Sequence, residues 1–279
     1  MYDPLGDEMK AFEKASAPEA FPRDKPIYAR IDGRGFSRFT RDMDRPFDAR
    51  MTAAMLETAQ GLFHETGAKA AYVQSDEISL VWEAQGERGE HFFGGKPFKM
   101  CSVLSGMATA LFTQALIHPE RGLGDYIERL PHFDARVVSM PDRATAAQMV
   151  AWRGQDARRN AITMIAQSRY SHKSLQGVST AQMRERLAAD GVRLEDYPNP
   201  SLNGSFIYGY KAMLPLDEET RMKIPERNRP SADHLFERRV AGVVNQYHPS
   251  QIRNLEAVIF EGASPISETH IKSAEKETT

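Results

Sequence analysis

Two acidic positions in the sequence have the surroundings that phosphate chemistry requires. Asp32 closes the segment 27–32 (IYARID) and is followed by Gly33, whereas Asp76 lies in the run QSDEIS with Glu77 directly behind it. Two neighbouring carboxylates repel each other, so they stay ionised together only when a cation lies between them. Oxygen ligands select a hard ion such as Mg²⁺, which takes one or two carboxylates plus substrate phosphates. We therefore expect Asp32 and Asp76 to hold two magnesium ions for phosphoryl transfer.

Basic residues surround the first of these acids. The loop from Arg34 to Ser37 follows Gly33 directly and offers backbone N–H groups and a guanidinium to a triphosphate. Gly33 has no side chain, so a backbone carbonyl or a triphosphate can approach it closely. The sequence holds two clusters of cations, which are Arg30, Arg34, Arg38, Arg41, Arg45 and Arg50, and Arg153, Arg158, Arg159, Arg169, His172 and Lys173. Either cluster, taken alone, is typical of a solvated surface.

The elements that must position these residues follow a recognisable order. The pattern predicts strands at 27–32, 70–74, 77–82 and 133–140, and helices from Asp48 to Gly67 and over 98–116. This βαββαβ order indicates an α+β, ferredoxin-like sheet with helices on one face. The first strand and the hairpin that bends at Asp76 are neighbours in such a sheet, so the two acids should meet at one end. Glu77 should point to the opposite face, to support the metal site from behind or to pair with an arginine.

The rest of the chain adds helices and an extension. We expect helices over 144–171 and 179–191 and a last strand over 201–212. The predicted organisation is a palm-like catalytic domain with helical additions over 1–213 and a C-terminal extension over 214–279. Its polar end, 264–279, is predicted to be a disordered tail.

Bulk composition fits an ordinary globular protein. The chain has 279 residues, 41% hydrophobic and 27% charged, with a net charge of -2 and Cys101 as its single cysteine. One cysteine excludes an internal disulfide and a cysteine-cluster metal site. No apolar run is long enough to cross a bilayer and the N-terminus lacks a signal pattern, so we expect a cytoplasmic protein. A nucleic-acid partner would have to be met through the local basic clusters.

Six motifs occur together in the order and spacing of one enzyme family. They are RIDGRGFSRF, RPFDARM, AYVQSDEISLVW, FDARVVSMP, WRGQDARRN and SHKSLQG. Over roughly residues 25 to 210 the chain resembles the tRNA(His) guanylyltransferase family, in its bacterial-type guanylyltransferase-like branch. The resemblance implies a polymerase-palm domain that adds nucleotides to the 5′ end of tRNA in the 3′-to-5′ direction. It further implies GTP and ATP as substrates, tRNA as partner and a homotetramer.

The resemblance also implies roles for individual residues. The catalytic and metal-binding set comprises Asp32, the Gly33 carbonyl and Asp76, with Glu77 beside them. The nucleotide-binding set is Arg30, Gly33, Arg34, Gly35, Phe36, Ser37, Arg45, Ser75, Lys99, Arg136 and Asn160. Phe36 is interpreted as packing under the nucleotide loop. A candidate tRNA-binding set is Arg153, Arg158, Arg159, His172 and Lys173.

One departure from the family pattern bears on the substrate. Members that add the extra guanylate to histidine tRNA carry HINN in the helix after the WR pair, whereas residues 158–161 here read RRNA. Only Asn160 of that motif is kept. The sequence therefore favours templated repair of 5′-truncated tRNAs over obligatory tRNA(His) maturation. In that reaction ATP or GTP first activates the 5′ end.

Two other readings of the same residues stay open. A palm-fold nucleotide cyclase uses the same paired aspartates and two metals, but it releases pyrophosphate from a nucleoside triphosphate with no RNA acceptor. A catalytically inactive tRNA-binding protein would need neither metal nor acceptor chemistry. The presence of both Asp32 and Asp76 argues against the inactive form.

Overall fold

A computed structural model describes residues 4–84, 86 and 89–267, and it is built around one six-stranded antiparallel sheet. The strand order is β4-β1-β3-β2-β5-β6. The strands are β1 Ile27–Gly33, β2 Ala70–Gln74, β3 Glu77–Trp82, β4 Phe133–Ser139, β5 Ser205–Pro215 and β6 Leu235–Val244. The first four strands have the order of a ferredoxin-like βαββαβ unit, so the predicted α+β fold is confirmed.

Helices cover both faces of the sheet. The principal helices are α3 Ala49–Thr66, α4 Pro97–Leu116, α5 Arg143–Arg169, α7 Thr180–Ala189 and α10 Leu255–Glu261. The N-terminal helix is α1 Pro4–Ser16. Helices of four to six residues are α2 Phe36–Phe39, α6 His172–Leu175, α8 Asn199–Asn203 and α9 Glu218–Lys223. Short 3-10 turns lie at Phe92–Gly95, Pro119–Arg121, Gly124–Arg129, Leu194–Asp196, Glu226–Asn228 and Pro249–Gln251. No helix in this described part is long and apolar enough to cross a bilayer.

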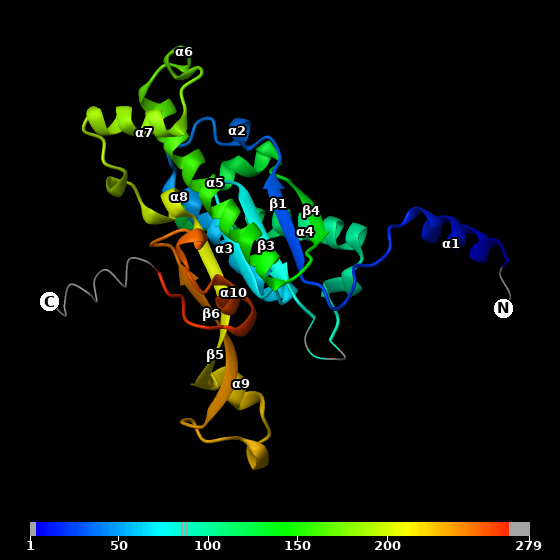
Figure 1. Ribbon diagram of the computed structural model, residues 1–279. Helices are drawn as coiled ribbons and strands as arrows, with labels where there is room; N and C mark the ends of the chain where they lie inside the picture. The colour runs from blue at the N-terminus through cyan, green and yellow to red at the C-terminus, as the bar shows by residue number, and fades with distance from the viewer. Residues whose placement is uncertain (1–3, 85, 87–88, 268–279) are drawn as a thin grey trace.

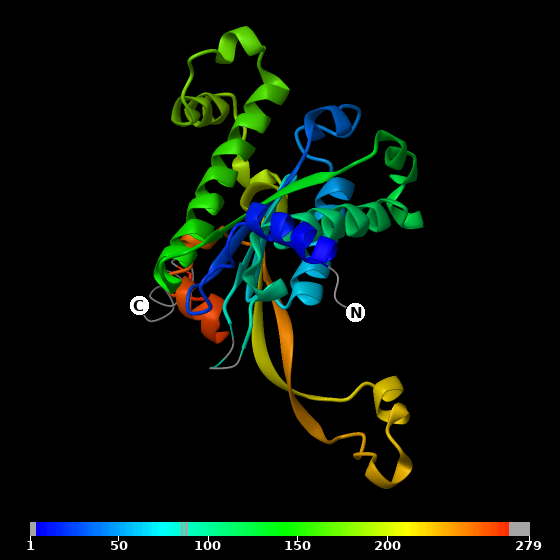
Figure 2. The ribbon, with the colours of Figure 1, turned by 90° about the vertical axis from the view of Figure 1, so that its right-hand side faces the viewer.

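Alternation along the strands divides the core between the two faces. Ile27, Ala29 and Ile31 of β1 pack with α3 and α4, the two helices of the βαββαβ unit. Tyr28 belongs to the other core, which β2, β5, α5 and α10 complete. Figure 2 shows the sheet between α5 on one side and α3 and α4 on the other. Because successive side chains point to opposite faces, one short strand serves both cores.

The predicted helix ends rest on local chemistry. Asp48 caps α3 by accepting hydrogen bonds from the backbone N–H groups of Arg50 and Met51, and Gly67 ends the helix at a φ of 64°. Ser179 and Gln182 form a capping box at the start of α7. Such caps satisfy backbone N–H groups that the first turn of a helix leaves unpaired. Because only a few residue types can do this, the sequence predicts where these helices begin.

The C-terminal part is joined to the sheet more closely than the sequence indicated. The expected boundary after residue 213 falls inside β5, and β6 pairs with β5 along its whole length. These two strands extend beyond the body as an arm that ends in α9 (Figure 1). Residues 235–261 are therefore part of the same sheet and core, because α10 packs in the α5-side core. The predicted disordered tail, 264–279, is wrong at its start, because Ser267 pairs with Ile252, and Asn254 donates to the Ser264 carbonyl and accepts from the Ile266 N–H, both at 2.9 Å. Residues 268–279 lie outside the described residues.

Phe112 and Phe98 of α4 offer a matched test of this core. The Phe112 side chain is fully buried against Phe36, Phe39 and Phe133, whereas Phe98 is 64% exposed. Phe112→Ala should lower the free energy of unfolding by about 3–5 kcal/mol, because it removes buried apolar surface and leaves a cavity. Phe98→Ala should change it by less than about 0.5 kcal/mol. Urea unfolding followed by circular dichroism measures both, and equal losses would contradict this packing.

Candidate active site

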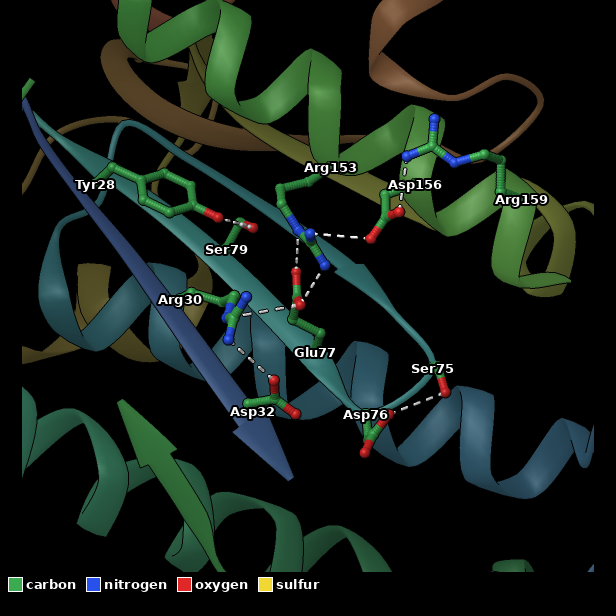
Figure 3. A network of polar contacts seen from close by, with 10 residues as sticks. All are labelled: Tyr28, Arg30, Asp32, Ser75, Asp76, Glu77, Ser79, Arg153, Asp156 and Arg159. Carbon is green, nitrogen blue, oxygen red and sulfur yellow. Dashed lines mark hydrogen bonds and ion pairs between the residues drawn. The ribbon is translucent and has the colours of Figure 1, made fainter. Parts of the chain in front are cut away.

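The two expected carboxylates meet at one end of the sheet. Asp32, the last residue but one of β1, lies opposite Glu77 of β3, and the Gly33 N–H donates to the Asp76 carbonyl at 3.0 Å. Asp32 and Asp76 line one cavity of about 210 Å³ together with Glu77 and Asn160. Figure 3 shows the carboxylates of Asp32 and Asp76 at the same end of the sheet. The convergence on which the sequence argument depended is therefore present in the fold.

The charge of Asp76 is poorly compensated by its protein surroundings. Burial raises the pKa of its carboxyl, the negative charge of Asp32 raises it further, and hydrogen bonds from its own backbone N–H and from Ser75 lower it. The Ser75 hydroxyl donates to Asp76 Oδ1 at 3.1 Å. Ser75 has a φ of 54°, in the left-handed region that side chains other than glycine rarely adopt. The tight bend thus holds an acid where its charged form is disfavoured.

The donor set suits a hard divalent cation. Among the described residues no three His, Cys, Asp or Glu side chains are arranged to hold a metal ion. A cation between Asp32 and Asp76 would therefore depend on two carboxylates, backbone oxygen and substrate oxygens, which is the arrangement Mg²⁺ accepts. It would also relieve the repulsion that raises the pKa of Asp76.

Arg30 lies behind these carboxylates with an unused donor. Its guanidinium is 3.6 Å from Asp32 and 3.8 Å from Glu77. Its Nε atom is buried and makes no hydrogen bond within the described part of the chain. A buried donor without an acceptor is costly, so this guanidinium is suited to receive an anionic ligand. Arg136 of β4 lies opposite Arg30 in the sheet and is exposed.

Glu77 is held by an arginine of α5. Arg153 donates from Nε to Glu77 Oε1 at 2.6 Å and makes a second bond to the other carboxylate oxygen, and its Nη1 reaches Asp156 at 3.0 Å. Burial raises the pKa of the Glu77 carboxyl, and Arg153 opposes that rise. Of the two roles considered for Glu77, the structure shows the ion pair. Asp76 lies in the turn before β3, and Glu77 begins that strand. In Figure 3 the Glu77 carboxylate points toward Arg153 of α5, whereas the Asp76 carboxylate points away from α5.

A second cavity of about 330 Å³ adjoins the acidic one. Ser75 and Asp76 line both, and the larger cavity extends to Arg45 and to Phe36 and Ser37 of the α2 segment. Small-molecule sites begin at about 300 Å³, so one nucleotide is of suitable size. Other lining residues that the sequence analysis did not select are Met43, Met51, Met55, Gln74, Met164, Ser201 and Ser205. Only the fold brings these distant segments together, and no local pattern marked them.

The glycine after Asp32 is required by packing. A Cβ on Gly33 would lie 2.5 Å from the ring of Phe36. That ring is buried and contacts Phe39, Phe112 and Phe133, with centroids 4.9 to 5.5 Å apart. The interpretation of Phe36 as packing under the loop is thus confirmed. Gly35, with a φ of 70°, caps the short helix that carries this ring.

The remaining candidate residues are distributed over three places. Lys99 is in the first turn of α4, over the ring of Phe93, and does not line either cavity. Arg158 donates to Asn203 at 3.1 Å, and Arg159 pairs with Asp156 at 2.8 Å. The side chains of His172 and Lys173 are exposed on α6. Arg153, the remaining member of the candidate RNA-binding set, bonds to two carboxylates, and its side chain is 11% exposed.

The fold and the site together define a palm-like α+β protein with paired carboxylates beside a nucleotide-sized cavity. Comparison with known proteins makes this class specific. A family model described as tRNAHis guanylyltransferase matches residues 6–141. A bacterial tRNA(His) guanylyltransferase (Thg1)-like protein solved in complex with ATP is 33% identical, with a TM-score of 0.67, over 73% of this chain and 88% of that chain. This chain belongs to the tRNAHis guanylyltransferase family.

Two further relatives define the extent of the similarity. A bacterial Thg1-like protein in complex with GTP is 26% identical, with a TM-score of 0.65, over 88% of this chain and 92% of that chain. The tRNA(His) guanylyltransferase of Schizosaccharomyces pombe is 33% identical over 48% of this chain and 50% of its own length. The chain therefore matches about half the length of that yeast protein but most of the bacterial ones.

The pKa of Asp76 predicts a pH-dependent cost to stability. The pKa of the Asp76 carboxyl in the folded protein lies above its ordinary value of 3.8. The free energy of unfolding should therefore be higher at low pH and should fall as the pH rises through that raised pKa. With a chelator present to remove divalent metal, Asp76→Asn should abolish much of this fall in the free energy of unfolding. Asp24→Asn should leave it unchanged, because the Asp24 side chain is 78% exposed. Urea unfolding from about pH 4 to about pH 8 measures the slopes. An unchanged slope in Asp76→Asn would contradict the assignment.

The pair between Arg153 and Glu77 predicts a non-additive double mutant. Their side chains are 11% and 18% exposed, so Arg153→Met leaves a largely buried carboxylate without its partner. That change should lower the free energy of unfolding by about 3 kcal/mol. The double variant Arg153→Met/Glu77→Gln should recover part of the loss, because the unpaired charge is removed. Additive losses in urea unfolding would show that the pair is not coupled.

Proposed function

We propose that this protein is a magnesium-dependent nucleotidyltransferase that adds nucleotides to the 5′ end of tRNA in the 3′-to-5′ direction. One observation carries the proposal, which is the meeting of Asp32 and Asp76 beside a cavity of nucleotide size. The printed names of the relatives support tRNA as acceptor, and the solved neighbours bound to ATP and GTP support nucleoside triphosphates as substrates.

The protein's own residues would bind and orient the substrates. Asp32, Asp76 and the Gly33 carbonyl would hold Mg²⁺, which when bound neutralises phosphate charge and polarises the reacting oxygens. The Arg30 guanidinium, whose Nε makes no hydrogen bond among the described residues, would donate to a phosphate oxygen close to Asp32. Arg45 and Ser75 line the larger cavity, where a base and a triphosphate would be held. Arg34, Arg136 and Asn160 complete the proposed nucleotide contacts, and Lys99 would reach a phosphate only at the edge of the site.

The reaction would proceed as an in-line displacement at phosphorus. A 5′-monophosphate end is first activated by adenylylation with ATP, which releases pyrophosphate. The 3′-hydroxyl of the incoming nucleotide then attacks the activated 5′-phosphorus, its oxygen–phosphorus bond forms, and AMP leaves. GTP would replace ATP where it activates the end, and a 5′-triphosphate end would need no activation. No side chain acts as a nucleophile, which agrees with a site made of acids and arginines.

The acceptor is proposed to be a 5′-truncated tRNA undergoing templated repair. The run RRNA at 158–161 supports this choice, because it keeps only Asn160 of the HINN motif. Arg158 and Arg159 occupy part of their donors within the protein, whereas His172 and Lys173 remain exposed for an RNA backbone. A homo-oligomer, expected as a tetramer, and a cytoplasmic location belong to the same proposal.

The catalytic assignment predicts a loss of chemistry without a loss of fold. Asp32→Ala and Asp76→Ala should each reduce nucleotide addition by at least about a thousandfold, since each removes a metal ligand. Unfolding in urea should show no destabilisation, because no core packing is removed. Asp24→Ala is the control, as its side chain is 78% exposed. Near-normal turnover in either site variant, with magnesium as the sole metal, would end the two-metal assignment.

One assay tests the proposed activity as a whole. It uses labelled GTP, magnesium and a tRNA that lacks its first 5′ nucleotide, with and without ATP. We expect label to enter the RNA, and a 5′-monophosphate acceptor to require the activating nucleotide. Release of pyrophosphate from a nucleoside triphosphate alone, with a cyclic product, would instead identify the cyclase. Absence of both products would favour a tRNA-binding protein without activity.

A further inference from the structure

A basic groove lies on the other side of α2 from the nucleotide-sized cavity. One wall is formed by the α2 segment, with Arg34, Arg38 and Arg41, and the other by residues 129–132, which lead into β4. Figures 1 and 2 show these two segments side by side at the end of the molecule where β1 stops. We call it the α2 groove, and it encloses about 690 Å³, roughly twice the volume of the nucleotide-sized cavity.

The α2 groove carries an excess of positive charge. Arg129 is occupied, because it donates to the Phe39 carbonyl at 2.7 Å and to Asp42 at 2.6 Å. That pair also consumes the negative charge of Asp42, the one acid that lines the groove. Arg34, Arg38 and Arg41 are exposed, and within the described part of the chain none of them pairs with a carboxylate. Three guanidinium groups thus face the groove without a counterion.

The α2 groove opens directly beside the catalytic end of β1. Arg34 follows Gly33, and its N–H donates to the His132 carbonyl at 3.0 Å, which ties the two walls together at that point. Phe36 lines both the groove and the nucleotide-sized cavity. A ligand in the groove would therefore extend away from Asp32 while the nucleotide occupies the other side of α2.

The walls indicate a strand rather than a second free nucleotide. The cations lie along the α2 segment at intervals of three or four residues, which suits repeated phosphates better than one triphosphate. Leu130 is 75% exposed at the groove and has a φ of 50°, a backbone conformation that bulky residues rarely adopt. An exposed apolar side chain among arginines can contact the sugar or base face of a nucleotide unit.

We propose that the α2 groove binds the sugar-phosphate backbone of the acceptor RNA next to its reacting 5′ end, through Arg38 and Arg41 in particular. This inference rests on the proposed function, because it supplies the path by which RNA reaches Asp32 and Asp76. It adds two arginines that lie outside the nucleotide-binding set and a surface separate from the basic residues of α5 and α6.

The test compares two double variants that remove equal charge. Arg38→Ala/Arg41→Ala alters the groove, and Arg227→Ala/Arg238→Ala alters exposed arginines near the tip of the arm. The dissociation constant for the 5′-truncated tRNA is measured by filter binding over a series of KCl concentrations. The groove variant should bind about tenfold more weakly, and the slope of log Kd against log salt should fall by about 1 to 2, since each phosphate contact contributes about 0.7 to 0.9. The arm variant should match the wild type.

A second measurement distinguishes RNA from free nucleotide. Binding of GTP and of ATP, each without RNA, is followed by calorimetry, and the groove variant should retain wild-type affinity for both. Weaker GTP or ATP binding would assign the groove to a triphosphate and overturn the proposal. If both double variants lost RNA affinity equally, the loss would come from the change in net charge, and the groove proposal would be overturned.

The outcomes separate this inference from the proposed function. If the wild-type protein extends the RNA and the groove variant binds RNA as tightly as the wild type, only the groove assignment fails. If the wild-type protein neither binds nor extends the RNA, the proposed function fails and the groove assignment falls with it.

Discussion

The repulsion between two acids at the end of one sheet is the constraint on which the rest of the structure depends. Asp32 and Asp76 share a cavity, and burial and mutual charge raise the pKa of Asp76. A protein that only needed stability would separate such groups or pair them with arginine. The guanidinium of Arg30 forms an ion pair with Asp32 at 3.6 Å, whereas Asp76 has no arginine partner among the described residues. The two carboxylates line a cavity of about 210 Å³ rather than packing against the core.

Arginines around this site are divided between internal support and external binding. Arg153 is used internally, since it bonds to Glu77 and Asp156 and so fixes α5 against β3. Arg129 is used in the same way at the wall of the α2 groove. Arg38 and Arg41 are free of such pairing in the described residues and face solvent. The role of an arginine therefore depends on the group that its guanidinium contacts in the fold, and not on its place in a basic stretch of sequence.

The two helical layers have different tasks. Helices α3 and α4 complete the ferredoxin-like unit and bury the Phe36 ring that supports the loop after Asp32. Helix α5, on the other face, closes the acidic cavity with Arg153 and Asn160 and carries two of the candidate RNA-binding residues, Arg158 and Arg159. The bacterial relatives solved with ATP and with GTP share this fold over most of their length.

The sequence by itself determined the βαββαβ order, the helix start at Asp48, and the meeting of Asp32 with Asp76. These features depend on periodicity and on contacts within a few residues, or on the neighbour relations that a known strand order imposes. Tertiary structure alone decided that Arg153 pairs with Glu77, that β6 joins the sheet, and that distant segments enclose the nucleotide-sized cavity. Those outcomes depend on how α5 crosses the sheet and on which carboxylate each long, flexible arginine side chain reaches. No local pattern encodes that choice, because the energy of an ion pair is set by burial and by all of its neighbours at once.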